Sequence, residues 1–308
     1  LRGEKSSGVY LPITCLEYTG VDLNSLNPGD PVSTINGVEI CKKYIPARQH
    51  ATSAGGAGSR TARRAKRTVA PTFFEHKDTE QLDYNLSAFK PGDEIEITLK
   101  MHGTSQRTAY LPVLKGYKRT LWDKLRGKEG TPIYDWGYVS GTRRVVLEDY
   151  EGGFYGSNSF REQHSKIFEG KLYKGEEVFY EVVGFTDSGS SIMAECANKK
   201  VQDKEFSKKY GDTTVFSYGC EEKQSDIYVY RMTMTNEDGF VVEYTPDFMR
   251  YRCEQMGVKC VPVMWRGRIP EHPASAADPT ISAGEWIKNV AERYYDGPDP
   301  IGKTHIRE

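Results

Sequence analysis

The sequence has 308 residues, of which 37% are hydrophobic and 28% charged, and its formal net charge is −1. These values are typical of a soluble globular protein with one large or two smaller domains, and no apolar run approaches the roughly 20 residues that cross a bilayer. The six cysteines are scattered without a CxxC pair, which argues against a zinc ribbon and a disulfide framework. We therefore expect reduced thiols, a cytoplasmic location and no membrane partner.

The first 55 residues combine short β-rich runs with turn signals. The run "GVYLPITCL" at 8–16 predicts a strand, and Asn36-Gly37 between two β-rich runs predicts a tight hairpin. Short strands of this kind suit a small β-barrel, which we assign to residues 1–55.

Basic residues then gather in a stretch rich in Ala, Gly and Ser. Between positions 48 and 67 there is no acidic residue, and the basic ones are Arg48, Arg60, Arg63, Arg64, Lys66 and Arg67. On a near-neutral protein, this pattern indicates either a local contact with a polyanion or a solvated loop, and charge alone leaves both open. We predict a basic linker over residues 56–70.

A larger unit with mixed elements is predicted from Pro71 onward. Strand patterns occupy 90–100, 176–185 and 225–235, and 238–244 is the expected hairpin partner of the last. The segment 245–257 predicts a helix. Thr245 and Pro246 are expected to begin it, Gly257 to end it, and Met249, Cys253 and Met256 to form its inner face. This order predicts an α+β fold.

Two of these strands carry polar groups in unusual places. The alternation from Ile95 to Leu99 puts the apolar side chains on one face, so Lys100 points away from them. Glu181 interrupts an otherwise apolar strand, where an unpaired carboxylate is costly. We therefore expect a hydrogen-bond donor or a hydrated metal ion beside Glu181.

The segment "KMHGTS" at 100–105 resembles the nucleotide-accepting motif of the ligase and capping-enzyme superfamily, in which lysine is followed two residues later by Asp or His and then by Gly. Segments at 138–147, 179–185 and 226–267 resemble the motifs that follow in that superfamily, in the same order, and the last is similar to phage-type RNA ligases. The N-terminal segment resembles the oligonucleotide-binding (OB) barrel of a bacterial nick-sealing RNA ligase group.

The resemblance implies an ATP-dependent RNA ligase, with a nucleotidyltransferase domain of ATP-grasp-like antiparallel sheets and helices over residues 71–308. Lys100 would attack ATP to give lysyl-AMP, pass AMP to a 5′-phosphate, and allow a 3′-hydroxyl to displace it. The implied partners are ATP, RNA and Mg²⁺ or Mn²⁺. His102 favours an RNA ligase, because DNA ligases usually carry Asp there.

The resemblance also implies residue roles. The catalytic set is Lys100, His102, Arg143 and Glu181. The nucleotide-binding set adds Gly103, Ser105, Arg107 and Tyr230, with Tyr230 as the aromatic that stacks on adenine. A lysine at its reference pKa of about 10.4 is protonated at neutral pH, so it needs neighbouring cations before it can attack phosphorus. Arg143, Arg107 and a metal ion are the candidates.

Two departures from the family pattern stand out. Arg231 follows Tyr230, where the family usually has an acid. Glu308 matches the first residue of a later Glu-Gly motif and is the implied metal ligand, so we expect the domain to be truncated at its C-terminal end. A similar Asp-Gly match at 236–242 falls inside the predicted hairpin and is rejected.

Other interpretations of these residues stay open. Lys100 could be a surface lysine, His102 could only shape its loop, Arg143 could pair with a nearby acid, and Tyr230 could be core, with Tyr228 taking the ligand role. A DNA ligase or a capping-type guanylyltransferase uses the same lysine chemistry. A nucleic-acid-binding module without transferase activity is a further alternative. Oligomeric state is not predicted.

Overall fold

A computed structural model describes residues 13–27, 34–39, 69–76, 79–143, 145–147, 159–197, 204–236, 238–275, 278–295 and 298–302. The chain divides into two units, Leu1–Arg63 and Arg64–Glu308, and the division falls inside the predicted linker. The basic cluster between Arg48 and Arg67 and the expected metal ligand, Glu308, lie outside the described residues. The predictions made for them stay predictions.

The first unit contains a confirmed hairpin. Strands β1 (Thr34–Ile35) and β2 (Val38–Glu39) pair antiparallel across Asn36-Gly37. Asn36 and Gly37 have positive φ angles of 47° and 78°, as a type I′ turn requires.

The strand predicted over 8–16 is wrong from Ile13 onward, where the 3-10 helix η1 (Ile13–Thr19) begins, followed by η2 (Leu23–Ser25). Local hydrogen bonds favour the turn over an extended chain, because the Thr19 hydroxyl donates to the Leu16 carbonyl at 2.7 Å. Gly20 then leaves the helix with a φ of 72°. The barrel predicted for residues 1–55 stays a prediction.

The second unit has an α+β architecture, as predicted, built on one large sheet. Its strand order is β11-β10-β7-β4-β5-β6, and β12 pairs with β10. The strands are β4 (Thr104–Lys118), β5 (Thr131–Gly141), β6 (Val146–Leu147), β7 (Glu176–Gly184), β10 (Ser225–Thr235), β11 (Val241–Glu243) and β12 (Lys259–Cys260). All neighbours are antiparallel except β10 and β12. The predicted strands at 176–185 and 225–235 and the hairpin with 238–244 are confirmed.

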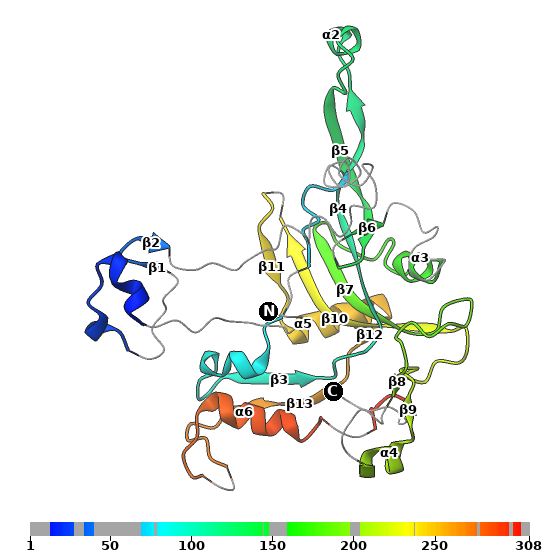
Figure 1. Cartoon of the computed structure of the whole chain (residues 1–308). Coiled ribbons are helices and arrows are strands. Elements are labelled where there is room, and N and C mark those ends of the chain that lie inside the picture. Colours follow the sequence, from blue (N-terminus) through cyan, green and yellow to red (C-terminus); the bar gives the residue numbers. More distant parts are fainter. Residues whose placement is uncertain are drawn as a thin grey trace. The chain divides into compact units, whose positions relative to one another are not determined.

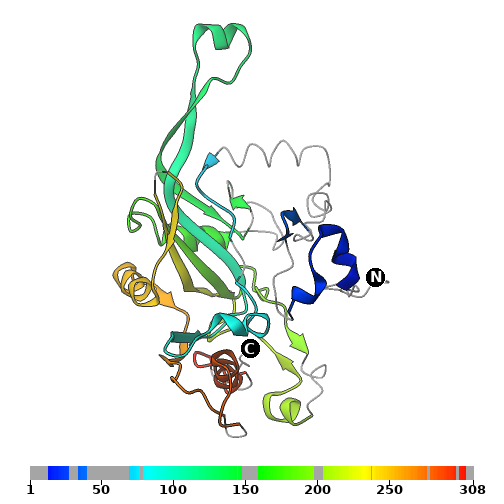
Figure 2. The same ribbon diagram turned by 90° about the vertical axis from the view of Figure 1, so that its left-hand side faces the viewer.

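One end of this sheet extends into a two-stranded arm. β4 and β5 pair from Arg107 and Gly141 out to Lys118 and Thr131, and the outer half of this ribbon projects away from the other strands (Figures 1 and 2). The short helix α2 (Leu121–Leu125) closes its far end. Nothing in the sequence analysis anticipated this arm.

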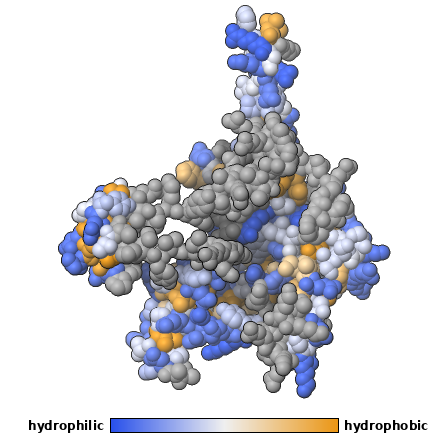
Figure 3. Space-filling model, viewed as in Figure 1, coloured by the Kyte–Doolittle hydropathy of each residue, from blue (hydrophilic) through white to orange (hydrophobic). Residues whose placement is uncertain are grey.

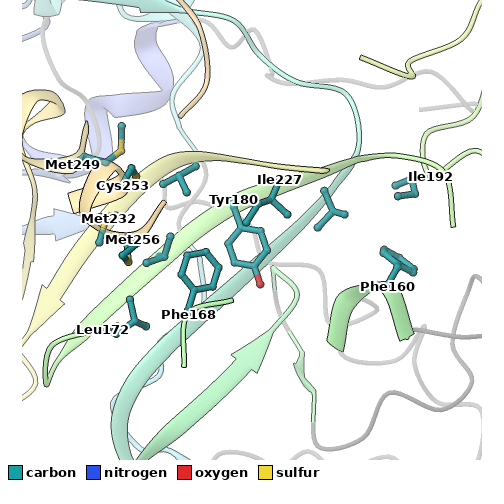
Figure 4. Close-up of a cluster of buried hydrophobic side chains, with 13 residues drawn as sticks. Phe160, Phe168, Leu172, Tyr180, Ile192, Ile227, Met232, Met249, Cys253 and Met256 are labelled. Atoms are coloured by element: carbon teal, nitrogen blue, oxygen red, sulfur yellow. The ribbon is translucent and has the colours of Figure 1, made fainter. Parts of the chain in front are cut away.

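The principal core lies between the large sheet and two helices, α3 (Ser159–Lys166) and α5 (Pro246–Met256). Tyr180 of β7 is fully buried among Phe168, Ile227 and other apolar side chains (Figure 4). The predicted helix over 245–257 is confirmed, since Thr245 caps it and Gly257 ends it with a φ of 69°. Its predicted inner face, Met249, Cys253 and Met256, is buried in this core.

A second layer supports the strand that leads to Lys100. β3 (Glu94–Thr98) pairs antiparallel with β13 (Val263–Arg268), and helix α6 (Ala283–Glu292) packs beside them (Figure 1). The remaining elements are η4 (Leu82–Tyr84), η5 (Leu86–Ala88), β8 (Cys196–Ala197), α4 (Lys204–Tyr210) and β9 (Thr213–Thr214). Within the described ranges, no helix is both long and apolar enough to cross a membrane.

A buried ion pair ties α5 to the start of β7. Arg252, with a side chain 3% exposed, donates to both carboxylate oxygens of fully buried Glu176 at 2.8 Å. The Tyr244 hydroxyl also donates to this carboxylate, at 3.0 Å. Removal of the arginine alone would leave a buried charge without its main partner.

We therefore predict that Arg252→Met lowers the free energy of unfolding by about 3–5 kcal/mol. The matched control is Arg268→Met, because Arg268 pairs with Glu94 across side chains that are 65% and 72% exposed, and such pairs contribute less than about 1 kcal/mol. Urea unfolding at neutral pH measures both. Equal losses in the two variants would contradict the prediction.

Candidate active site

The loop that carries Lys100 is anchored on both sides of the lysine. Leu99 and Met101 are 3% and 6% exposed and belong to one apolar cluster, whereas Lys100 between them is exposed. β3 ends at Thr98, so Lys100 lies on the connection to β4 rather than within the strand. The two buried side chains therefore anchor the loop to this cluster, and the lysine between them faces outward.

His102 contacts two aromatic residues beside the loop. Its backbone N–H donates to the Tyr218 hydroxyl at 2.8 Å, and its ring lies 4.5 Å from the Phe216 ring, centroid to centroid. These contacts fit the interpretation in which His102 shapes the loop.

Gly103 joins the loop to the central strand β7. A Cβ atom at this position would lie 2.1 Å from the backbone oxygen of Val182, far inside van der Waals contact. The Gly103 N–H donates to the Glu181 carboxylate. Only glycine allows this approach without a backbone shift, so the Gly of the motif has a direct packing reason.

Glu181 lies beside the loop in a mostly buried position. Burial raises the pKa of its carboxyl group to about 7, while the Gly103 N–H and the positive charges of Arg161, Lys100 and Arg143 act to lower it. A hydrogen-bond donor, the Gly103 N–H, therefore lies beside this carboxylate, as the sequence predicted. Lys100 and Arg143 therefore lie near enough to Glu181 to act on its charge, although the three residues come from separate motifs.

Tyr230 reaches the same neighbourhood through an irregularity in β10. Val229 pairs with Tyr180 of β7 and Arg231 pairs with Phe179, and the register shifts at Tyr230 between them. Tyr230 is therefore the extra residue of a β-bulge, a feature that redirects side chains. Its hydroxyl lies 3.1 Å from the Ser105 hydroxyl and 3.5 Å from His76 Nε2. Burial raises the pKa of Tyr230. Tyr228, its competitor, is 5% exposed in the apolar cluster that anchors the loop.

Arg107 is held inside the protein rather than at the surface of the site. Its side chain is 2% exposed, pairs with Glu177 at 2.7 Å, and donates to the backbone oxygens of Phe74 and Thr142. Its guanidinium lies 3.7 Å from the centroid of the Phe73 ring. Burial raises the pKa of Glu177 to about 7, and Arg107 limits that rise. These contacts indicate that buried Arg107 has a structural role.

The sequence analysis missed Arg161, which organises the start of β4. It is 4% exposed, and its guanidinium donates to the Ser105 backbone oxygen at 3.2 Å and to the Thr104 hydroxyl at 2.5 Å. Its charge also acts on Glu181. Arg161 follows Phe160 in a short helix, and no local pattern there indicates a role. His76 and Tyr218 were missed for the same reason.

The described residues do not form a dedicated metal site. Within them, no group of three or more His, Cys, Asp or Glu side chains is placed to hold an ion. Glu308 lies outside that part of the chain.

The raised pKa of Glu181 predicts a pH-dependent effect on stability. An acid whose pKa is raised on folding destabilises the folded state as pH climbs from about 4.3 toward 7. Glu181→Gln removes this ionisation, and its amide oxygen can still accept the Gly103 N–H. We expect the variant to match wild type near pH 4.5 and to exceed it in stability by up to about 3 kcal/mol near pH 8.

Urea unfolding of wild type and Glu181→Gln across that pH range measures the difference, with the exposed Glu254→Gln as the matched control. A difference that does not change with pH, or one that Glu254→Gln reproduces, would contradict the prediction.

Comparisons with known proteins leave the family open. No protein family model matches the chain, and neither does any curated protein. Among solved structures, one similar chain is described as an ATP-dependent DNA ligase from Aquifex aeolicus, with a TM-score of 0.35 and 10% identity. The match covers 72% of this chain and 44% of that one, so this chain spans less than half the length of its neighbour. At this level of likeness the match identifies neither the family nor the fold.

Proposed function

We propose that the protein is an ATP-dependent RNA ligase that uses Lys100 as its nucleophile to join 5′-phosphate and 3′-hydroxyl ends. One observation carries the proposal: residues from four separated motifs, Lys100, Arg143, Glu181 and Tyr230, lie around one loop. Glu181 interacts electrostatically with Lys100 and Arg143, and Tyr230 with Glu181 and Arg143. A chance surface lysine would have no reason to meet these partners.

The first chemical step requires a neutral amine and a site for the phosphates. The Lys100 nitrogen would form a bond to the α-phosphorus of ATP as the bond to the bridging oxygen breaks, and that electron pair would leave with pyrophosphate. The displaced ammonium proton would pass to solvent. Arg143 would face the charge that develops on the phosphates, which is the main catalytic requirement of such a transfer.

The later steps return the lysine to its starting state. A 5′-phosphate oxygen of RNA would attack the lysine-bound phosphorus, which breaks the nitrogen–phosphorus bond and leaves AMP on the RNA end. A 3′-hydroxyl would then attack the 5′-phosphorus and expel AMP. Lys100 regains its proton from solvent.

Glu181 and Tyr230 would hold the nucleoside. Glu181 lies opposite Ser105 and Tyr228 in the sheet. Its carboxylate could accept a ribose hydroxyl. The Tyr230 ring could stack on adenine, and the hydroxyl contact with Ser105 would hold the ring in place.

A divalent ion fits this site only as a partner of the nucleotide. Mg²⁺ is commonly bound through one or two carboxylates together with substrate phosphates, and Glu181 is a carboxylate in reach of that role. When bound, the ion would neutralise phosphate charge. Mg²⁺ or Mn²⁺ stays a prediction of the resemblance.

The test of the nucleophile is covalent labelling. Incubation with ATP and Mg²⁺ should add the mass of one AMP to the chain, on the peptide that contains Lys100, through an acid-labile bond. Lys100→Ala should lose the label, whereas the exposed-surface control Lys90→Ala should keep it. A label that survives in Lys100→Ala, or one obtained with GTP and not ATP, would overturn the proposal. Sealing of matched RNA and DNA nicks distinguishes the substrate.

The stacking role of Tyr230 predicts a split between two substitutions. Tyr230→Ala should weaken ATP binding by about 1–3 kcal/mol, the range for loss of a base–aromatic stack. Tyr230→Phe should leave ATP binding nearly unchanged and cost about 1 kcal/mol of stability through the lost hydrogen bond to Ser105. Calorimetric titration with ATP and urea unfolding measure the two effects. Equal loss of ATP binding in both variants would assign the role to the hydroxyl.

A further inference from the structure

The far end of the β4–β5 arm is an ordered structure with its own hydrogen bonds. Thr120 and Asp123 bond reciprocally at the start of α2: Asp123 Oδ2 accepts the Thr120 N–H at 2.9 Å and the Thr120 hydroxyl at 2.7 Å, and the Asp123 N–H donates to Thr120 Oγ1 at 3.2 Å. The Lys128 N–H donates to the Asp123 backbone oxygen at 2.9 Å. Gly130 has a φ of 90°, and a Cβ there would lie 2.5 Å from the Lys118 backbone oxygen. The tip is therefore held in a defined conformation by its own hydrogen bonds.

This ordered tip leaves large apolar side chains in solvent. Leu121, Trp122 and Leu125 are 78%, 69% and 79% exposed, although they lie within one short helix. Figure 3 shows a small hydrophobic patch beside hydrophilic residues at the end of the arm. An exposed tryptophan on a well-formed element, where the described residues offer it no apolar cover, is typical of a contact surface.

Basic residues flank the patch in the sequence. Between positions 115 and 130 the sequence has six basic and two acidic residues, and the basic ones are Lys115, Lys118, Arg119, Lys124, Arg126 and Lys128. Asp123, one of the two acids, is occupied by the bonds to Thr120. The Arg126 guanidinium lies 5.9 Å from the centroid of the Trp122 ring. The surface thus offers cations to phosphates and a planar aromatic to bases.

We infer that the tip of this arm binds a nucleic-acid strand, with the lysines on its phosphates and Trp122 stacked on an unpaired base. The combination of a basic track with an aromatic platform is the one that single-stranded nucleic acids require. A nucleic acid is favoured over a lipid surface because the basic residues extend from α2 onto the outer end of β4 as Lys118 and Lys115, the strand whose other end lies at the candidate active site.

The inference rests on the proposed function for the identity of the bound nucleic acid, because β4 connects the arm to the candidate active site. β4 has 15 residues and begins at Thr104, next to the loop of Lys100, so it spans up to about 50 Å. At the duplex spacing of about 3.4 Å per nucleotide in each strand, about 15 nucleotides span this distance, and a more extended single strand needs fewer. The arm would act as a remote grip on the RNA to be joined.

The test is direct binding of a labelled single-stranded RNA of about 20 nucleotides by the full chain, at several salt concentrations. Trp122→Ala should weaken binding by roughly 5- to 150-fold, whereas Trp122→Phe should keep most of it. The triple variant Lys115→Ser, Lys118→Ser, Lys128→Ser should weaken binding and reduce the slope of log affinity against log salt by about 0.7 for each phosphate that is no longer neutralised. The matched triple control is Lys90→Ser, Lys208→Ser, Lys209→Ser, which removes exposed charge elsewhere.

Covalent labelling by ATP, measured on the same variants, separates this inference from the proposed function. Tip variants should keep normal labelling, since that step involves only the pocket around Lys100. Loss of RNA affinity in the tip variants supports the arm even if no labelling occurs in any protein. Unchanged RNA affinity and salt slope would overturn it. So would binding to anionic vesicles, or self-association in sedimentation, that depends on Trp122 while RNA affinity does not.

Discussion

The contact between Gly103 and β7 is the constraint on which the site depends. The Val182 backbone oxygen occupies the place that a side chain at position 103 would need, and the Gly103 N–H is bonded to the Glu181 carboxylate. This approach fixes where β4 begins and therefore where the preceding loop lies. Leu99 and Met101 then hold the loop to the core, so that Lys100 is presented outward. Buried backbone and side-chain contacts on either side of Lys100 therefore determine where this exposed lysine lies.

One β-bulge determines which side chains of β10 lie on the sheet face beside that loop. In a regular strand, Tyr228 and Tyr230 would share a face and Arg231 would point the opposite way. The register shift between Val229 and Arg231 changes this, because Tyr228 and Arg231 both lie opposite residues of the same β7 face. Arg231 therefore joins the site side, where its guanidinium lies 5.4 Å from the centroid of the Phe179 ring. Its guanidinium also pairs with Glu243 of β11 at 2.7 Å, so the cation has a structural partner at this position.

Sequence periodicity predicted what local patterns control. The helix capped by Thr245, the hairpin at Asn36-Gly37 and the outward face of Lys100 each follow from a few adjacent residues. The contacts of Arg161 and His76 could not be predicted, because both reach the site from segments with no regular pattern around them. The strand expected at Ile13 failed since the hydrogen bond from Thr19 competes locally with an extended chain. Arg107 looked like a free cation, and only the fold reveals that Glu177 opposes it.

The balance of charge around Glu181 explains what kind of ligand this face can take. Burial raises the pKa of this carboxyl group to about 7, so near neutral pH it carries only part of its charge, and three basic side chains, Arg161, Lys100 and Arg143, act on it electrostatically. The three basic side chains and the partly charged carboxylate therefore give this region a net positive charge. The positive charges repel one another unless an anion binds among them. The polyphosphate of the proposed nucleotide would supply that anion, and its binding would stabilise the existing arrangement of charges. A neutral or cationic ligand would gain nothing from it.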